Sequence, residues 1–252
     1  MTRLRSHLLA LLAAALPATA LPGAAEAQQT VLMPLGGPVG VIRLSLPDPL
    51  SPAPFPVVVL LPDGPDAGNR ADPIVDRLLD RGIAVVEVDA DDEPDPAGLA
   101  EALEDTAPGW IAPGRIGVLG FGSGGRAALL WPGRGPVVVL YPACDGAPVP
   151  VVAAGALVLH ADNAAERAAC TSLPVRALPV PGATHAWDHR NGADEDAVAR
   201  LPHPDGSGTR LTARRYPWAI EWVADTVASH FAAALLRPDA AGPVVSASGG
   251  AP

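Results

Sequence analysis

Short, continuously apolar runs recur along the chain and alternate with stretches of helical character. The runs expected to form strands are Val39 to Leu46, Val57 to Leu61, Ile83 to Val88, Ile116 to Leu119, Val137 to Leu140, Ala156 to Leu159 and Val175 to Val180. Most lack polar alternation, which is typical of parallel strands covered on both faces. Arg43 and Ser45 interrupt the first run, so we expect that run to be an edge strand.

Helical candidates lie between these runs. They are Ala71 to Arg81, Ala97 to Thr106, Gly124 to Trp131, Ala164 to Thr171 and the long segment Trp218 to Leu236. The alternation predicts an α/β fold, a three-layer α/β/α sandwich with a mainly parallel sheet and right-handed crossovers. In the last helix, helical spacing predicts a core-facing stripe of Ile220, Val223, Val227, Phe231 and Leu235.

The polar segment from His189 to Tyr216 contains glycine, proline and charges of both signs. This composition predicts a long loop, which either flanks a pocket or is simply mobile.

The two ends of the chain predict processing and disorder. Arg3 and Arg5, a short apolar run and the site Ala25-Glu26-Ala27 follow one another as in a secretory signal peptide, here residues 1–27. That run is far below the roughly 20 residues that span a bilayer, so no membrane span is expected. Residues 28–237 suit one domain, and residues 238–252, mostly Ala, Gly, Pro and Ser, predict a disordered tail. We therefore expect a secreted or periplasmic protein.

Charge and cysteine content narrow the partners and the compartment. The net charge of −10 opposes binding to nucleic acid or to anionic lipid, because both need clustered cations. Cys144 and Cys170 are the two cysteines. Export favours a single disulfide between them, and two free thiols are the alternative.

The most informative motif is Gly-Phe-Gly-Ser-Gly-Gly at residues 120–125, between a predicted strand and a predicted helix. A tight, glycine-rich strand-to-helix turn is typical of a nucleophile elbow. Gly120, Gly122 and Gly125 also match the dinucleotide fingerprint. That alternative is weaker, because earlier strands precede the motif and no acidic residue ends the following strand.

The motif resembles that of the dienelactone hydrolase family of α/β-hydrolases, in which a Gly-Phe pair precedes Ser or Cys, one variable residue and Gly-Gly. The resemblance extends from about Val39 to Phe231. It assigns the nucleophile position to Gly122, which has no side chain that could attack a substrate. Ser123, one place later, would instead give its backbone N–H to an oxyanion hole, together with an N–H at Gly64.

The same resemblance supplies an acid and a base. Asp162 follows a late strand and matches the family's acid, although an aspartate there could simply cap the next helix. His185 lies in Pro-Gly-Ala-Thr-His-Ala-Trp-Asp at residues 181–188, which is similar to the family's histidine loop. We expect the Asp162 carboxylate to lie about 3 Å from the His185 ring.

Other polar residues have weaker functional interpretations. Glu87 and Asp89 follow a strand and could be site acids, but solvated strand-end residues are the simpler interpretation. His185 and His189 have a spacing that could hold a metal on a helix, yet Pro181 and Gly182 predict a turn there. No metal or organic cofactor is therefore expected.

Two functions remain open. One is an exported hydrolase of esters or lactones in which Ser123 attacks, His185 transfers the proton and Asp162 holds the imidazole. The other is a catalytically inactive homologue, a pseudoenzyme, that binds a small ligand or a partner. The position of the Ser123 hydroxyl relative to the His185 ring separates the two functions.

Overall fold

The computed structural model describes residues 29–34, 41–48, 53–64, 69–88, 99, 102–103, 105, 109–133, 135–147, 155–189 and 198–237. The predicted signal peptide, the predicted tail and Asp89 lie outside these residues. Only Leu99, Ala102, Leu103 and Asp105 of the predicted helix Ala97 to Thr106 are described, and all four are helical.

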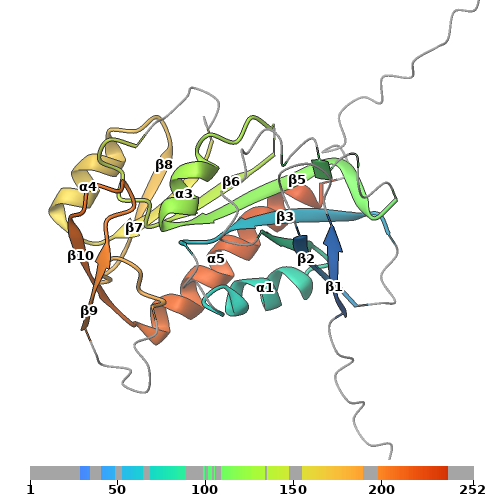
Figure 1. The fold of residues 1–252 in the computed structure, drawn as a ribbon, viewed down its shortest axis with the longest axis horizontal. Coiled ribbons are helices and arrows are strands. Elements are labelled where there is room, and N and C mark those ends of the chain that lie inside the picture. The colour runs from blue at the N-terminus through green and yellow to red at the C-terminus, as the bar shows by residue number, and fades with distance from the viewer. Residues whose placement is uncertain are drawn as a thin grey trace, which may run out of the picture.

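The centre of the fold is an eight-stranded sheet (Figure 1). In spatial order its strands are β1 (Gln29–Pro34), β2 (Val41–Leu46), β4 (Ala84–Val88), β3 (Phe55–Leu61), β5 (Ile111–Phe121), β6 (Val137–Leu140), β7 (Leu157–Ala161) and β8 (Arg176–Val180). β1 and β2, and β2 and β4, pair antiparallel, whereas all pairs from β4 to β8 are parallel. The predicted mainly parallel sheet is confirmed.

The prediction that the first apolar run is an edge strand is wrong. β1, which the sequence pattern did not predict, pairs with β2 on the side away from β4. The polar residues of β2 have structural explanations: Arg43 lies opposite Glu87 of β4 and donates to its carboxylate at 3.4 Å, while Ser45 is buried. Alternation in β2 therefore reflects a cross-strand ion pair rather than an exposed edge.

Helices cover both faces of the sheet (Figure 1). α1 (Asp72–Leu79) and α5 (Pro217–Leu235) pack on one face, and α3 (Gly122–Ala128) and α4 (Ala164–Thr171) on the other. Two hydrophobic cores result, and β3 is buried along its whole length because it is covered on both faces. In the described part of the chain, no helix has the length and apolar character needed to cross a membrane.

The predicted stripe of α5 forms part of the core that α5 shares with α1. Val223, Val227, Phe231 and Leu235 are each at most 2 % exposed, and Ile220 packs against the same core while partly exposed. The spacing of four residues places these side chains on one side of the helix.

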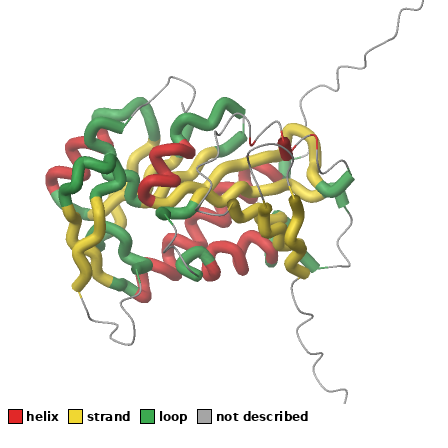
Figure 2. The backbone as a smooth tube through the Cα atoms, viewed as in Figure 1, coloured by secondary structure: helices red, strands yellow, loops and turns green. Residues whose placement is uncertain are grey.

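The predicted long loop contains a β-hairpin. β9 (Val198–Pro202) and β10 (Arg210–Arg214) pair antiparallel and form a separate two-stranded sheet (Figure 2). The amino-acid sequence of the hairpin has little apolar pattern, because Ala213 is the only buried residue of the two strands. Ala213 forms a bridge with His185, and the Arg214 N–H donates to the Thr184 hydroxyl at 3.0 Å. The hairpin is therefore attached to the loop that carries His185.

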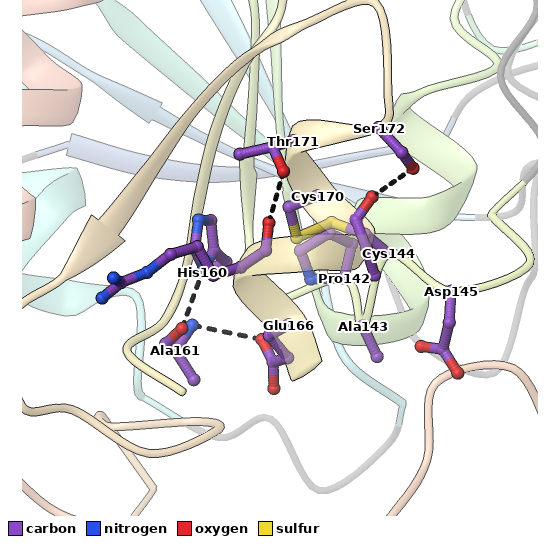
Figure 3. The surroundings of a disulfide bond; sticks show 12 residues. Pro142, Ala143, Cys144, Asp145, His160, Ala161, Glu166, Cys170, Thr171 and Ser172 are labelled. Atoms are coloured by element: carbon purple, nitrogen blue, oxygen red, sulfur yellow. Dashed lines mark hydrogen bonds between the residues drawn. A yellow bond between two sulfur atoms is a disulfide. The ribbon is translucent and has the colours of Figure 1, made fainter. Parts of the chain in front are cut away.

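The predicted disulfide between Cys144 and Cys170 is confirmed, with a Cα–Cα distance of 4.9 Å (Figure 3). It joins the turn after β6 to the last turn of α4. The turn that carries Asp145 is therefore covalently fixed to the helix that follows β7.

The direction of the strand connections reverses between β3 and β5. The chain passes from β3 to β4 on one side and from β5 to β6 on the other, so the loops after β3 and β5 diverge. In open parallel sheets, ligand sites lie at this reversal, at the carboxyl ends of the strands. Asp63 follows β3 and Gly122 follows β5, so both residues lie at this position.

Candidate functional site

The strand-to-helix turn has the geometry expected of an elbow. β5 ends in the extended Phe121, and α3 begins at Gly122 with a φ of +47°, a conformation that favours glycine. A Cβ on Gly124 would lie 2.3 Å from the carbonyl oxygen of Pro62, so a glycine is required where α3 approaches the loop after β3. Gly122 therefore stands at the apex, and Ser123 is the residue that follows it.

A carboxylate fills the space in which a nucleophilic side chain would begin. A Cβ on Gly122 would lie 2.1 Å from Oδ1 of Asp63, far closer than two such atoms can approach. The same oxygen accepts the backbone N–H of Ser123 at 2.9 Å and the Ser123 hydroxyl at 3.2 Å. The Asp63 side chain and a side chain at residue 122 therefore exclude each other.

The predicted oxyanion N–H of Ser123 is consequently bound to an anion from the protein itself. Asp63 immediately precedes Gly64, the other predicted oxyanion residue, which has a φ of +72°. Sequence reasoning singled out this loop for its backbone and overlooked the Asp63 side chain.

His185 lies in a buried environment beside Arg70. Its side chain is almost fully buried, and its ring packs edge-on against Tyr141 with 5.2 Å between ring centroids. Neither ring nitrogen has a hydrogen-bond partner among the described residues. The pKa of His185 is lowered from 6.5 to about 4, mainly by burial and to a smaller extent by the charge of Arg70. The imidazole is therefore neutral at pH 7.

Asp162 does not form the predicted hydrogen bond with His185. Its carboxylate instead accepts the Gly182 N–H at 2.9 Å and pairs with Arg167. The pKa of Asp162 is lowered, mainly by the hydrogen bond from Gly182 and to a smaller extent by Arg167. The Asp162 side chain is 24 % exposed, so it lies near the surface, where it binds Gly182 and Arg167 rather than the buried imidazole of His185. The helix-cap alternative is also wrong, because Asn163 caps α4 by accepting the Glu166 N–H.

A buried polar network that the sequence analysis missed lies beside His185. Arg70 donates to Asp188 at 2.9 Å and to the Tyr141 hydroxyl at 2.6 Å. The Tyr141 hydroxyl in turn donates to Asp188 at 2.7 Å. Arg70 also forms an ion pair with Asp63 at 3.8 Å. The network therefore connects the histidine loop to the carboxylate above Gly122.

A cavity of about 410 Å³ opens at this network. It is lined by Arg70, Pro73, Asp188, Arg215, Pro217, Trp218, Ile220 and Glu221. Its volume lies within the range of roughly 300–1,000 Å³ that is typical of small-molecule sites. The cavity lies between the N-terminal ends of α1 and α5, beside the elbow rather than directly above it.

The remaining candidate residues have structural partners. Glu87 pairs with Arg43. The pKa of Glu87 is raised, mainly because the carboxyl group is buried. Nδ1 of His160 contacts the Ala161 carbonyl at 2.8 Å (Figure 3). Gly120, Gly122 and Gly125, the glycines of the dinucleotide alternative, form the tight turn between β5 and α3. Asp63 fills the space above Gly122.

Comparisons with known proteins agree with the fold. No protein-family model matches the chain, and no curated protein matches its sequence. Among solved structures, an esterase of the fungus Rhizomucor miehei has a TM-score of 0.51 at 14 % identity, covering 82 % of this chain and 84 % of that chain.

Two further esterases give similar values. Carboxyl esterase 2 of the mycorrhizal fungus Tuber melanosporum has a TM-score of 0.50 at 16 % identity and covers 82 % of this chain and 87 % of its own. The hyperthermophilic esterase of the archaeon Pyrobaculum calidifontis has a TM-score of 0.50 at 16 % identity, with coverages of 81 % and 86 %. The chain therefore has the α/β-hydrolase fold. Sequence identities this low are evidence for a shared fold but not for a shared function.

Proposed function

We propose that this protein has lost serine-type ester hydrolysis and uses its α/β-hydrolase fold to bind a small molecule. The observation that carries this proposal is the position of Asp63, whose carboxylate stands where the nucleophilic side chain would begin. The same carboxylate takes the backbone N–H of Ser123 that would otherwise stabilise a substrate oxyanion.

The chemistry of the site supports this proposal. Serine attack needs a hydroxyl hydrogen-bonded to a basic imidazole, and an acid that orients the imidazole. Here the Ser123 hydroxyl donates to the Asp63 carboxylate rather than to an imidazole, and Asp162 is engaged by Arg167. Neither nitrogen of His185 has a hydrogen-bond partner among the described residues. The three groups of the proposed triad are therefore each present but not connected.

The second candidate function is hydrolysis of an ester or lactone through Ser123, His185 and Asp162. The resemblance to dienelactone hydrolases and the fold shared with esterases favour it. The neutral imidazole of His185 could also accept a proton at pH 7. For this function the Asp63 side chain would have to move away from Ser123. That movement would break the charge-assisted hydrogen bonds that Asp63 accepts from the Ser123 N–H and hydroxyl.

The cavity beside Arg70 and Asp188 is the proposed ligand site. It combines charged groups with apolar walls from Trp218, Ile220 and Pro73, the mixture typical of small-molecule sites. The indole of Trp218 is 48 % exposed, so its fluorescence can report binding. A non-hydrolysed aryl ester, such as p-nitrophenyl acetate, should quench this fluorescence saturably, and Trp218→Phe should remove that part of the signal.

We further propose that the protein is exported. The disulfide supports export, since disulfides persist in oxidising compartments. Mass spectrometry of the protein purified from its native host tests this, and the expected mature N-terminus is Gln28. A mature protein that retains residues 1–27 would contradict it.

Ester hydrolysis by the disulfide-intact protein tests the main proposal. The wild type, Ser123→Ala and His185→Gln should all hydrolyse p-nitrophenyl acetate at the same near-background rate, and a serine-directed phosphonate should not label the protein. Robust turnover that Ser123→Ala abolishes would instead establish the serine mechanism. Turnover that survives Ser123→Ala but is lost in Asp63→Asn would assign the attack to the Asp63 carboxylate.

A further inference from the structure

Three side chains that could bind a metal converge away from the elbow. Asp145 follows the disulfide-bonded Cys144, while His203 and Asp205 lie in the turn between β9 and β10. One potential ligand atom from each of Asp145, His203 and Asp205 lies within 4.8 Å of the other two. The His203 side chain is only 7 % exposed, so its ring is held in place by its surroundings. The sequence pattern did not predict this cluster.

The two carboxylates lie at opposite nitrogens of the His203 ring. Nδ1 is 2.7 Å from Oδ1 of Asp205 and accepts the Asp205 backbone N–H at 3.3 Å. The Ser207 N–H donates to Oδ1 of Asp205 at 2.8 Å and so fixes the Asp205 side chain. Asp205 thus contacts the Nδ1 side of the ring through its backbone and its side chain, and Nε2 faces Asp145.

The other side of the ring has the spacing of two ligands of one metal ion. Nε2 of His203 is 3.3 Å from Oδ1 of Asp145. Charge-assisted N–H···O bonds are shorter, about 2.7–2.9 Å. Two atoms bound tetrahedrally to zinc at about 2.0–2.1 Å lie roughly 3.3 Å apart. The separation therefore matches that of two ligands of one tetrahedrally coordinated zinc ion.

The surroundings add negative charge and rigidity. Glu166 of α4 is 8 % exposed, and it interacts electrostatically with both Asp145 and His203. The Glu166 carboxylate accepts the Ala161 N–H at 3.1 Å, which fixes its position (Figure 3). The disulfide holds the turn of Asp145 against the same helix. A cation placed here would thus face three carboxylates and one imidazole.

We propose that Asp145, His203 and Asp205 form a structural site for a divalent transition-metal ion of the zinc type. Nε2 of His203 and the Asp145 carboxylate bind the ion, Asp205 orients the imidazole or supplies a further oxygen, and water completes the coordination. The ion fastens the β9–β10 hairpin to the disulfide-bonded turn. Because that hairpin contacts the His185 loop through Ala213, metal binding also stabilises the loop beside the elbow.

Metal titration of the mature, disulfide-intact protein tests this site. After treatment with a chelator, one equivalent of Zn²⁺ should bind in isothermal titration calorimetry with a dissociation constant in the micromolar range or below. Co²⁺ should bind at the same site and give visible absorption bands typical of tetrahedral coordination. Mg²⁺ should bind far more weakly, because it prefers oxygen ligands in octahedral geometry.

Variants separate this site from adventitious binding. Asp145→Asn, an exposed change that should not disturb folding, and His203→Gln should each weaken zinc binding by about tenfold or more. His230→Gln on α5 is the matched histidine control and should bind zinc like the wild type. Failure to bind zinc at about 1 mM, or equal binding by the wild type, Asp145→Asn and His203→Gln, would overturn the proposal. These outcomes do not depend on whether esters are hydrolysed.

Discussion

Oδ1 of Asp63 lies 2.9 Å from the backbone nitrogen of Ser123 and accepts its N–H. In an active α/β-hydrolase, this N–H faces the oxyanion of the reacting substrate. The protein therefore holds a permanent anion in the place of a transient one, and the missing side chain of Gly122 makes the necessary space. The absence of a side chain at Gly122 and the position of the Asp63 carboxylate are therefore linked.

The first prediction concerns the steric exclusion between Asp63 and residue 122. Gly122→Ser should lower the free energy of unfolding by about 2–3 kcal/mol, because it adds a clash with Asp63 to roughly 1–2 kcal/mol of left-handed backbone strain. Gly82→Ser is the matched control, since Gly82 has a φ of +75° and an added Cβ there would meet no atom within 4 Å. Urea unfolding of both variants measures the difference.

A double-mutant cycle isolates the clash. Asp63→Ala combined with Gly122→Ser should be more stable than the sum of the two single effects, by about 1 kcal/mol or more. Additive effects would mean that Asp63 does not occupy this space in solution. The Gly122→Ser variant alone should gain no esterase activity, because Asp162 stays bound to Arg167 and does not orient the His185 ring.

The second prediction concerns the buried pair of Arg70 and Asp188, whose side chains are 8 % and 6 % exposed. Asp188→Ala should destabilise the protein by about 3–5 kcal/mol, because it leaves a buried guanidinium without its principal counter-charge. Arg167→Ala is the control, since that side chain is 57 % exposed and such pairs contribute at most about 1 kcal/mol. Similar losses in both variants, measured by urea unfolding, would contradict the assigned role of the network.

Much of the scaffold could be predicted because its signals are local. β3 and β6 of the central sheet are wholly apolar, the other parallel strands are mostly so, and the turn around Gly122 carries its own glycines. The disulfide followed from the two cysteines and the expected export. The β9–β10 hairpin was missed because it is mostly exposed and therefore has little apolar pattern for a strand signal.

The connections within the site could not be predicted in the same way. Asp63 and Ser123 are 60 residues apart, and Arg70 and Asp188 are 118 apart, so no local spacing relates them. The partner of Asp162 is an exception. Arg167 lies five residues away, on the helix that begins after Asn163, so a local ion pair could have been considered before a long-range triad.

The third prediction concerns the disulfide, which closes a segment of 26 residues between Cys144 and Cys170. The loss of chain entropy in the unfolded state corresponds to about 3.5 kcal/mol for a loop of this length. Cys144→Ala with Cys170→Ala should lower the free energy of unfolding by an amount of this order. Reduction of the wild type should give the same change, and a reduced protein as stable as the oxidised one would contradict the prediction.

The last prediction concerns acid sensitivity, which follows from the burial of His185. Burial and Arg70 lower the pKa of His185 from 6.5 in the unfolded chain to about 4 in the folded protein. Between these values the unfolded chain binds a proton that the folded protein does not, so stability falls as the pH falls through this window. The full shift corresponds to about 3 kcal/mol, of which about 2 kcal/mol should be lost between pH 7 and pH 5.

His185→Gln should remove this part of the pH dependence, because glutamine does not titrate. Urea unfolding at pH 7 and pH 5 should therefore show a drop in stability for the wild type that is about 2 kcal/mol larger than the drop for the variant. Tyr141→Phe is the packing control: it alters the ring that contacts His185 but should keep the pH dependence. Parallel stability profiles for the wild type and His185→Gln would mean that the imidazole is solvated and able to take a proton, which would favour the hydrolytic alternative.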